Sequence, residues 1–110
     1  MTLYTYSALV TRIVDADTVL LDISLGFDLW HKNQRIRLAY INAPELVTPE
    51  GKVARDYVAM LLGPLPATVT LVTIKDRTDN YGRYLGVLTT AQGVNVNQTL
   101  LDTGHAIPWP

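Results

Sequence analysis

The feature of the sequence that most limits its fold is a series of short segments with the patterns of β-strands. They run over residues 4–14, 18–23, 34–41, 68–74 and 84–88. Each alternates apolar with polar side chains or is rich in β-branched and aliphatic residues, which is typical of strands with a buried face. Arg35 and Arg37, for example, alternate with Ile36 and Leu38. The sequence therefore predicts a mainly β protein.

Two helical segments interrupt these strands. Apolar side chains at positions 53, 57, 60 and 61 recur at helical spacing before Gly63-Pro64, and residues 96–103 precede Gly104, a common helix C-terminal cap. The resulting order is three strands, a helix, two strands and a helix. We therefore expect the five-stranded Greek-key barrel called the OB-fold, with one helix between strands three and four and a second at the C-terminal end.

The segments between these elements read as loops. Residues 24–33 contain Gly26, and we expect Phe27, Leu29 and Trp30 to fold inward or to cap the barrel. Residues 42–51 contain two prolines and a glycine and also read as a loop.

Length and composition limit the class of protein. The 110 residues fit a single domain, residues 1–110, and the 48% of hydrophobic residues argues against disorder. The chain has no cysteine, which excludes disulfides and thiolate metal sites. No apolar run approaches the roughly 20 residues that span a membrane, and residues 1–10 lack the basic region of a signal peptide. We expect a cytoplasmic protein without a membrane partner, unless a leader was removed, and favour a monomer.

Three polar clusters lie at the ends of predicted strands. They are Asp15, Asp17 and Thr18; Arg37 with residues 42–45; and residues 79–83. Carboxylate and amide oxygens suit a hard cation such as Ca²⁺, arginines bind two phosphate oxygens at once, and a carboxylate can orient water. Each cluster alone is also an ordinary turn or a solvated strand edge. The net charge of −1 argues against a protein that coats nucleic acid, but it allows an enzyme that binds one or two phosphates.

The order and spacing of four segments carry more information than any one cluster. They are VDADTVLL (residues 14–21), RLAYINAPE (37–45), RTDNYGRYL (77–85) and VNQTLLDTGHA (96–106). In this order they resemble the D-G-D-T-V, R-L-x-x-I-D-x-P-E, D-x-Y-G-R and V-N-x-x-L-x-x-G-x-A segments of the staphylococcal nuclease, or thermonuclease-like, family. The resemblance covers residues 7–106.

The resemblance implies a calcium-dependent endonuclease that hydrolyses phosphodiester bonds of single-stranded or frayed DNA or RNA. It gives catalytic roles to Arg37 and Arg83, on the phosphate, and to Glu45, on the attacking water. The implied metal site has Asp17 as a direct ligand and Asp15 in the outer shell, with Asn42 and the carbonyl of Ala43 at the other ligand positions. Tyr81 and Asn80 are the implied nucleotide contacts.

The chain departs from the family pattern at four positions. Asn42 stands where the family has a second aspartate, so we expect weaker calcium binding, because affinity depends on ligand charge. Ala43 replaces a threonine from which only a backbone carbonyl is required. Ala16 replaces a glycine that often has positive φ, which would strain the turn. Asn80 replaces a lysine that contacts the nucleotide.

Two other functions remain open at this point. The chain could be a nucleic-acid-binding barrel without catalysis, which Asn42 favours, since a fold does not dictate its function. It could also be a structural module of a phage particle. The long segment at residues 24–33 is more similar to short phage- or prophage-type members of the family than to the secreted enzyme.

Overall fold

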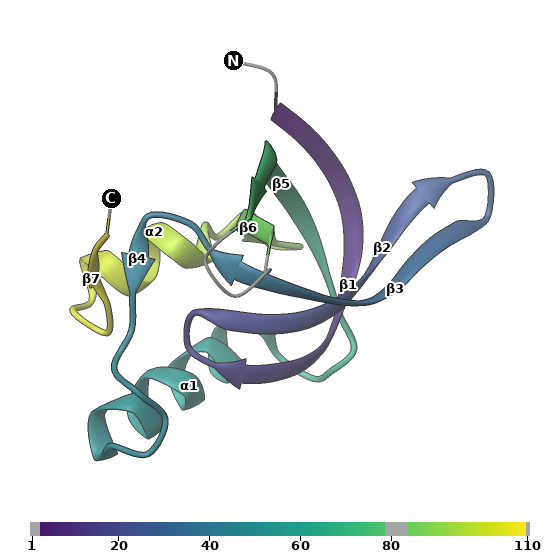
Figure 1. Cartoon of the computed structure of the whole chain (residues 1–110). Coiled ribbons are helices and arrows are strands. Elements are labelled where there is room, and N and C mark those ends of the chain that lie inside the picture. Colours follow the sequence, from purple (N-terminus) through teal and green to yellow (C-terminus); the bar gives the residue numbers. More distant parts are fainter. Residues whose placement is uncertain (1–2, 79–83, 110) are drawn as a thin grey trace.

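Five strands close into a barrel, as the sequence predicted. The structure, a computed structural model, describes residues 3–78 and 84–109. The strands are β1 (Leu3–Asp15), β2 (Thr18–Gly26), β3 (Leu29–Leu38), β5 (Ala67–Thr78) and β6 (Tyr84–Thr90), and their order in the barrel is β1-β2-β3-β6-β5. All neighbours are antiparallel except β3 and β6. Figure 1 shows the helices gathered at one side of this barrel.

The two helices and a small second sheet complete the fold. Helix α1 (Pro49–Leu62) precedes β5, and α2 (Val96–Asp102) follows β6. Strand β4 (Ile41–Asn42) pairs with β7 (Ile107–Pro108). Helix α1 begins inside the segment that we expected to be a loop, because the Thr48 side chain caps it by accepting a hydrogen bond from the Gly51 N–H. In the described ranges, no helix is long and apolar enough to cross a membrane.

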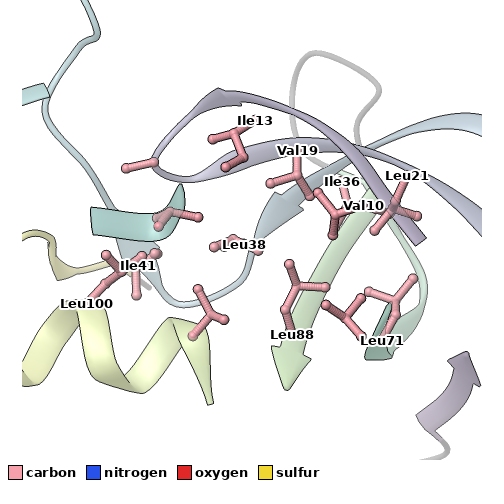
Figure 2. Packing of buried hydrophobic residues seen from close by; sticks show 14 of the residues in the cluster. Val10, Ile13, Val19, Leu21, Ile36, Leu38, Ile41, Leu71, Leu88 and Leu100 are labelled. Carbon is pink, nitrogen blue, oxygen red and sulfur yellow. The ribbon is translucent and has the colours of Figure 1, made fainter. Parts of the chain in front are cut away.

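The core lies inside the barrel and under the helices. Inward side chains from the strands meet Ala54 and Val58 of α1 and Val96 and Leu100 of α2. The labelled strand residues in Figure 2 point into this cluster; they are Val10, Ile13, Val19, Leu21, Ile36, Leu38, Ile41, Leu71 and Leu88. On β3, the expected alternation is confirmed, since the apolar positions are buried and the arginines face outward.

The expectation for residues 24–33 is wrong. Instead of forming a loop folded onto the barrel, β2 and β3 continue as a two-stranded arm that projects from it (Figure 1). Ser24 pairs with Trp30, and β1 accompanies β2 only as far as Ile23. The arm therefore has no third strand to cover it, which leaves Phe27 96% and Trp30 44% exposed.

A buried asparagine joins α2 to the barrel. The side-chain NH₂ of Asn97 donates to the carbonyl oxygens of Ala39 and Gly86, both at 3.0 Å, and its oxygen accepts from the Leu88 N–H at 3.1 Å. Ala39 lies in the turn that leads from β3 to β4 and Asn42. Asn97 therefore connects the helix to the backbone that carries one of the predicted metal ligands.

We predict that Asn97→Ala lowers the free energy of unfolding by at least about 2 kcal/mol, because the Leu88 N–H and the carbonyls of Ala39 and Gly86 all lose this partner. Urea unfolding measures the change. The control is Gln98→Ala, an exposed neighbour on the same helix, for which we expect a change within about 0.5 kcal/mol. Equal effects of the two substitutions would contradict the bridging role of Asn97.

Candidate active site

The site is built on one row of residues across three strands. Asp15 on β1 lies opposite Thr18 on β2, and Thr18 lies opposite Arg37 on β3. Residues directly opposite each other in antiparallel strands point to the same face, so these three side chains share the outer face of the barrel. Asp17, in the turn between β1 and β2, lies next to this row. The barrel thus unites the first two polar clusters of the sequence.

The carboxylate of Asp17 is buried and held from several sides. Its Oδ2 forms an ion pair with Arg37 Nη1 at 3.2 Å and accepts a hydrogen bond from the Ala43 N–H at 3.0 Å. Its Oδ1 accepts from the Thr18 hydroxyl at 3.2 Å. The Asp17 carbonyl accepts from the Leu38 N–H at 2.8 Å, which fixes the turn against the end of β3. The end of β3 and the loop at Ala43 therefore fix the position of this carboxylate.

Arg37 also holds the side chain of Asn42. Its Nη2 donates to Asn42 Oδ1 at 3.1 Å, so that one guanidinium contacts two of the three predicted direct ligands. The backbone of Asn42 is in turn fixed by the pairing of β4 with β7, where it lies opposite Ile107. The Asn42 oxygen therefore faces the same cluster as the Asp17 carboxylate.

Asp15 is under electrostatic strain in this cluster. Burial, followed by a hydrogen bond with Asp17 and the negative charge of Asp17, raises the pKa of the Asp15 carboxyl to about 6. Its Oδ1 is buried without a hydrogen-bond partner among the described residues. A buried acceptor in that state indicates a place where positive charge or an ordered water belongs.

These residues fit a hard cation. Asp15, Asp17 and Asn42 offer side-chain oxygens, which Ca²⁺ prefers, and one buried oxygen of Asp15 has no hydrogen-bond partner among the described residues. In the part of the chain that the structure describes, no three His, Cys, Asp or Glu side chains gather into a metal site. The cluster offers two carboxylates and an amide, and the expectation of weak calcium binding stays a prediction.

The start of α1 positions Glu45. The Glu45 carbonyl accepts hydrogen bonds from the Thr48 N–H at 3.0 Å and the Thr48 hydroxyl at 2.7 Å. A methyl group added to Gly51 would overlap the same carbonyl oxygen. Sequence reasoning missed the roles of Thr48, which precedes α1, and of Gly51 in its first turn, although the threonine-proline pair at positions 48 and 49 is a recognisable helix start. The Glu45 side chain is exposed.

Two further outcomes concern the predicted site residues. Arg83, Tyr81 and Asn80 lie outside the described residues, and their roles stay predictions. The expected strain at Ala16 is wrong, because Ala16 is not among the described residues with positive φ. The turn between β1 and β2 closes without a left-handed residue at that position, so it does not need the glycine.

Comparison with known proteins adds independent information. The family model of staphylococcal nuclease homologues matches residues 35–109. The chain is 34% identical over 120 residues to Endonuclease YhcR of Bacillus subtilis (strain 168), an alignment that covers 96% of this chain and 9% of the relative. It is 35% identical over 97 residues to an uncharacterized endonuclease of Escherichia coli O157:H7, covering 88% of this chain and 57% of the relative. The chain thus corresponds to only part of each relative.

Proposed function

The chain belongs to the family of staphylococcal nuclease homologues, and we propose that it hydrolyses phosphodiester bonds of single-stranded or frayed DNA or RNA with the help of calcium. The observation that carries this proposal is the Arg37 guanidinium, which lies between the oxygens of Asp17 and Asn42 on an outer face of the barrel. This contact supports the proposal, because a guanidinium suits a phosphate and the oxygens of Asp17 and Asn42 suit a hard cation. The endonuclease names of the relatives support the same chemistry.

Asp17, Asn42 and the Ala43 carbonyl would hold the cation directly, with Asp15 in the outer shell. When bound, calcium supplies positive charge next to the phosphate and favours ionisation of water. The Ala43 N–H already binds Asp17, so the loop that brings the carbonyl also fixes the main carboxylate. The neighbouring Asp15 carboxylate, raised in pKa by burial and by Asp17, becomes easier to ionise beside added positive charge.

Arg37 would grip the phosphate under attack. Its planar fork can bind two phosphate oxygens at once, which a lysine cannot do. Because Arg37 is only 12% exposed on its side chain and is anchored by two partners, it needs little reorganisation to act. Arg83 would stabilise the charge on the phosphate and the leaving oxygen.

Glu45 would orient the water and take one of its protons. The water oxygen forms the new bond to phosphorus while the bond from phosphorus to the leaving sugar oxygen breaks, and that oxygen takes up a proton from solvent water. The exposed carboxylate of Glu45 sits on a backbone that Thr48 holds in place at the start of α1, which supports this role.

A binding module without catalysis is the second candidate. Its support is Asn42, which leaves two carboxylates in the cluster and so reduces the charge that a cation would meet. Such a protein would bind single strands through the same arginine and would not cleave them.

We predict that Glu45→Gln lowers kcat on single-stranded DNA about a hundredfold or more, because the amide cannot take the proton. The rate is measured with calcium and with a chelator. The control is Glu50→Gln, an exposed carboxylate in the first turn of α1, for which we expect the parent rate. An unchanged kcat for Glu45→Gln would exclude this residue as the base, and no cleavage by the parent would favour the binding module.

We predict that Asn42→Asp tightens calcium binding, from a dissociation constant on the order of millimolar in the parent, because it adds a charged oxygen beside Asp17. Without metal the same substitution should lower stability, since three carboxylates would then repel one another. Calorimetric titration of both proteins, with and without a nucleoside bisphosphate, measures the binding. By linkage, the nucleotide should raise the affinity for calcium by the same factor by which calcium raises the affinity for the nucleotide. Equal calcium affinity in the two proteins would mean that Asn42 does not contact the metal.

A further inference from the structure

A second row of residues lies directly beside the site row on the same outer face. Arg12 on β1 is opposite Leu20 on β2, and Leu20 is opposite Arg35 on β3. On β2 and β3 this row is two residues from the row of Thr18 and Arg37, a distance of about 7 Å along a strand. The two arginines are two strand spacings apart, or about 10 Å between their Cα atoms.

Both arginines of this second row are available for a ligand. Arg12 and Arg35 are exposed, and neither has an ion pair or a side-chain hydrogen bond within residues 3–78 and 84–109. Leu20 between them is half-buried, so the aliphatic parts of both side chains have an apolar surface to lie on. The acidic residue next along this face of β2 is Asp22, whose Oδ1 accepts a hydrogen bond from the Asn33 N–H at 2.9 Å. The row therefore presents positive charge that a phosphate can reach.

The same face continues onto the projecting arm and there carries an aromatic side chain. Half-buried residues alternate with buried ones along β2, which places Ser24 on the outer face with Leu20. Trp30 lies opposite Ser24 and therefore shares this face. It is 44% exposed, and the arm that carries it stands clear of the barrel in Figure 1. The distance from Thr18 to Ser24 along β2 is about 20 Å.

We propose that this face binds the polynucleotide strand that leads away from the scissile phosphate. Arg35 and Arg12 bind phosphates next to the one held by Arg37, and Trp30 stacks on a base further along the strand. Arginines in line with an exposed aromatic residue are the combination that single-stranded nucleic acid requires, because the backbone is anionic and every base has a π-face. The proposal rests on the proposed function for the position of the scissile phosphate. It implies that long substrates bind more tightly than short ones.

Binding of fluorescein-labelled oligothymidylates tests this surface, with anisotropy recorded in a chelator so that no cleavage occurs. One probe has about twelve nucleotides and the other is a dinucleotide. For Arg12→Ala/Arg35→Ala we expect the dissociation constant of the long probe to rise about tenfold or more, and clearly more than that of the dinucleotide. The slope of log K against log salt should become shallower by about 0.7 for each phosphate that the variant no longer binds. Trp30→Ala should weaken binding of the long probe about fivefold or more.

The matched control is Arg55→Ala, which removes an exposed guanidinium from α1, away from this face. Thermal unfolding verifies that each variant is folded. The proposal is overturned if the double variant binds the long probe as tightly as the parent, if both probes weaken equally, or if Arg55→Ala has the same effect. Cleavage of the dinucleotide in calcium separates the two claims. If the parent and the double variant both cleave the dinucleotide and the double variant binds the long probe as tightly as the parent, this surface alone is refuted. If the parent never cleaves but the double variant selectively loses binding of the long probe, the nuclease activity alone is refuted.

Discussion

The ion pair between Arg37 and Asp17 is the interaction on which the site depends. Asp17 is 7% exposed, and a buried carboxylate is stable as an ion only when a positive charge and hydrogen-bond donors compensate for lost water. Arg37 supplies the charge, and the Ala43 N–H and the Thr18 hydroxyl supply the donors. These interactions draw the turn before β2, the end of β3 and the loop after β4 together. The geometry of the barrel and the position of the site are thus parts of one arrangement.

Among the described residues, the negative charge of this cluster is only partly compensated. Arg37 compensates Asp17, whereas the Asp15 carboxyl keeps a raised pKa and a buried oxygen that has no hydrogen-bond partner within residues 3–78 and 84–109. Strained carboxylates of this kind are common where a protein binds a cation, since the ligand supplies the missing charge. Asn42 moderates the effect, because its amide provides an oxygen without a third negative charge. The same outer face then carries two exposed arginines, Arg12 and Arg35, so that the proposed cation site and the proposed anion-binding surface are neighbours.

The sequence predicted the barrel well because its strands have one buried face, and period-two alternation reports that burial directly. The sequence also predicted that Asp17, Arg37 and Asn42 share one site. That prediction came from the order of the family-like segments and not from any contact between these side chains. The arm was missed because Phe27 and Trp30 are bulky and apolar, and such residues normally lie in a core. Their exposure follows from strand pairing that continues beyond the third strand of the sheet, which alternation within one segment does not report. The hydrogen bond from the Ala43 N–H to Asp17 depends on the path of a loop, so the sequence pattern did not predict it either.

The most direct test of this account compares Arg37→Lys with Arg55→Lys in the cleavage of a single-stranded oligonucleotide in calcium. Both substitutions keep the positive charge and remove the planar fork, but Arg55 is an exposed residue of α1 to which no role in the site is given. If Arg37 grips the phosphate under attack, its substitution should lower kcat on the order of 10²–10³-fold, with calorimetric unfolding showing a folded protein. Arg55→Lys should leave kcat close to that of the parent. Similar kcat values for the two variants, or a parent that does not cleave, would contradict the assignment of this cluster as a nuclease site.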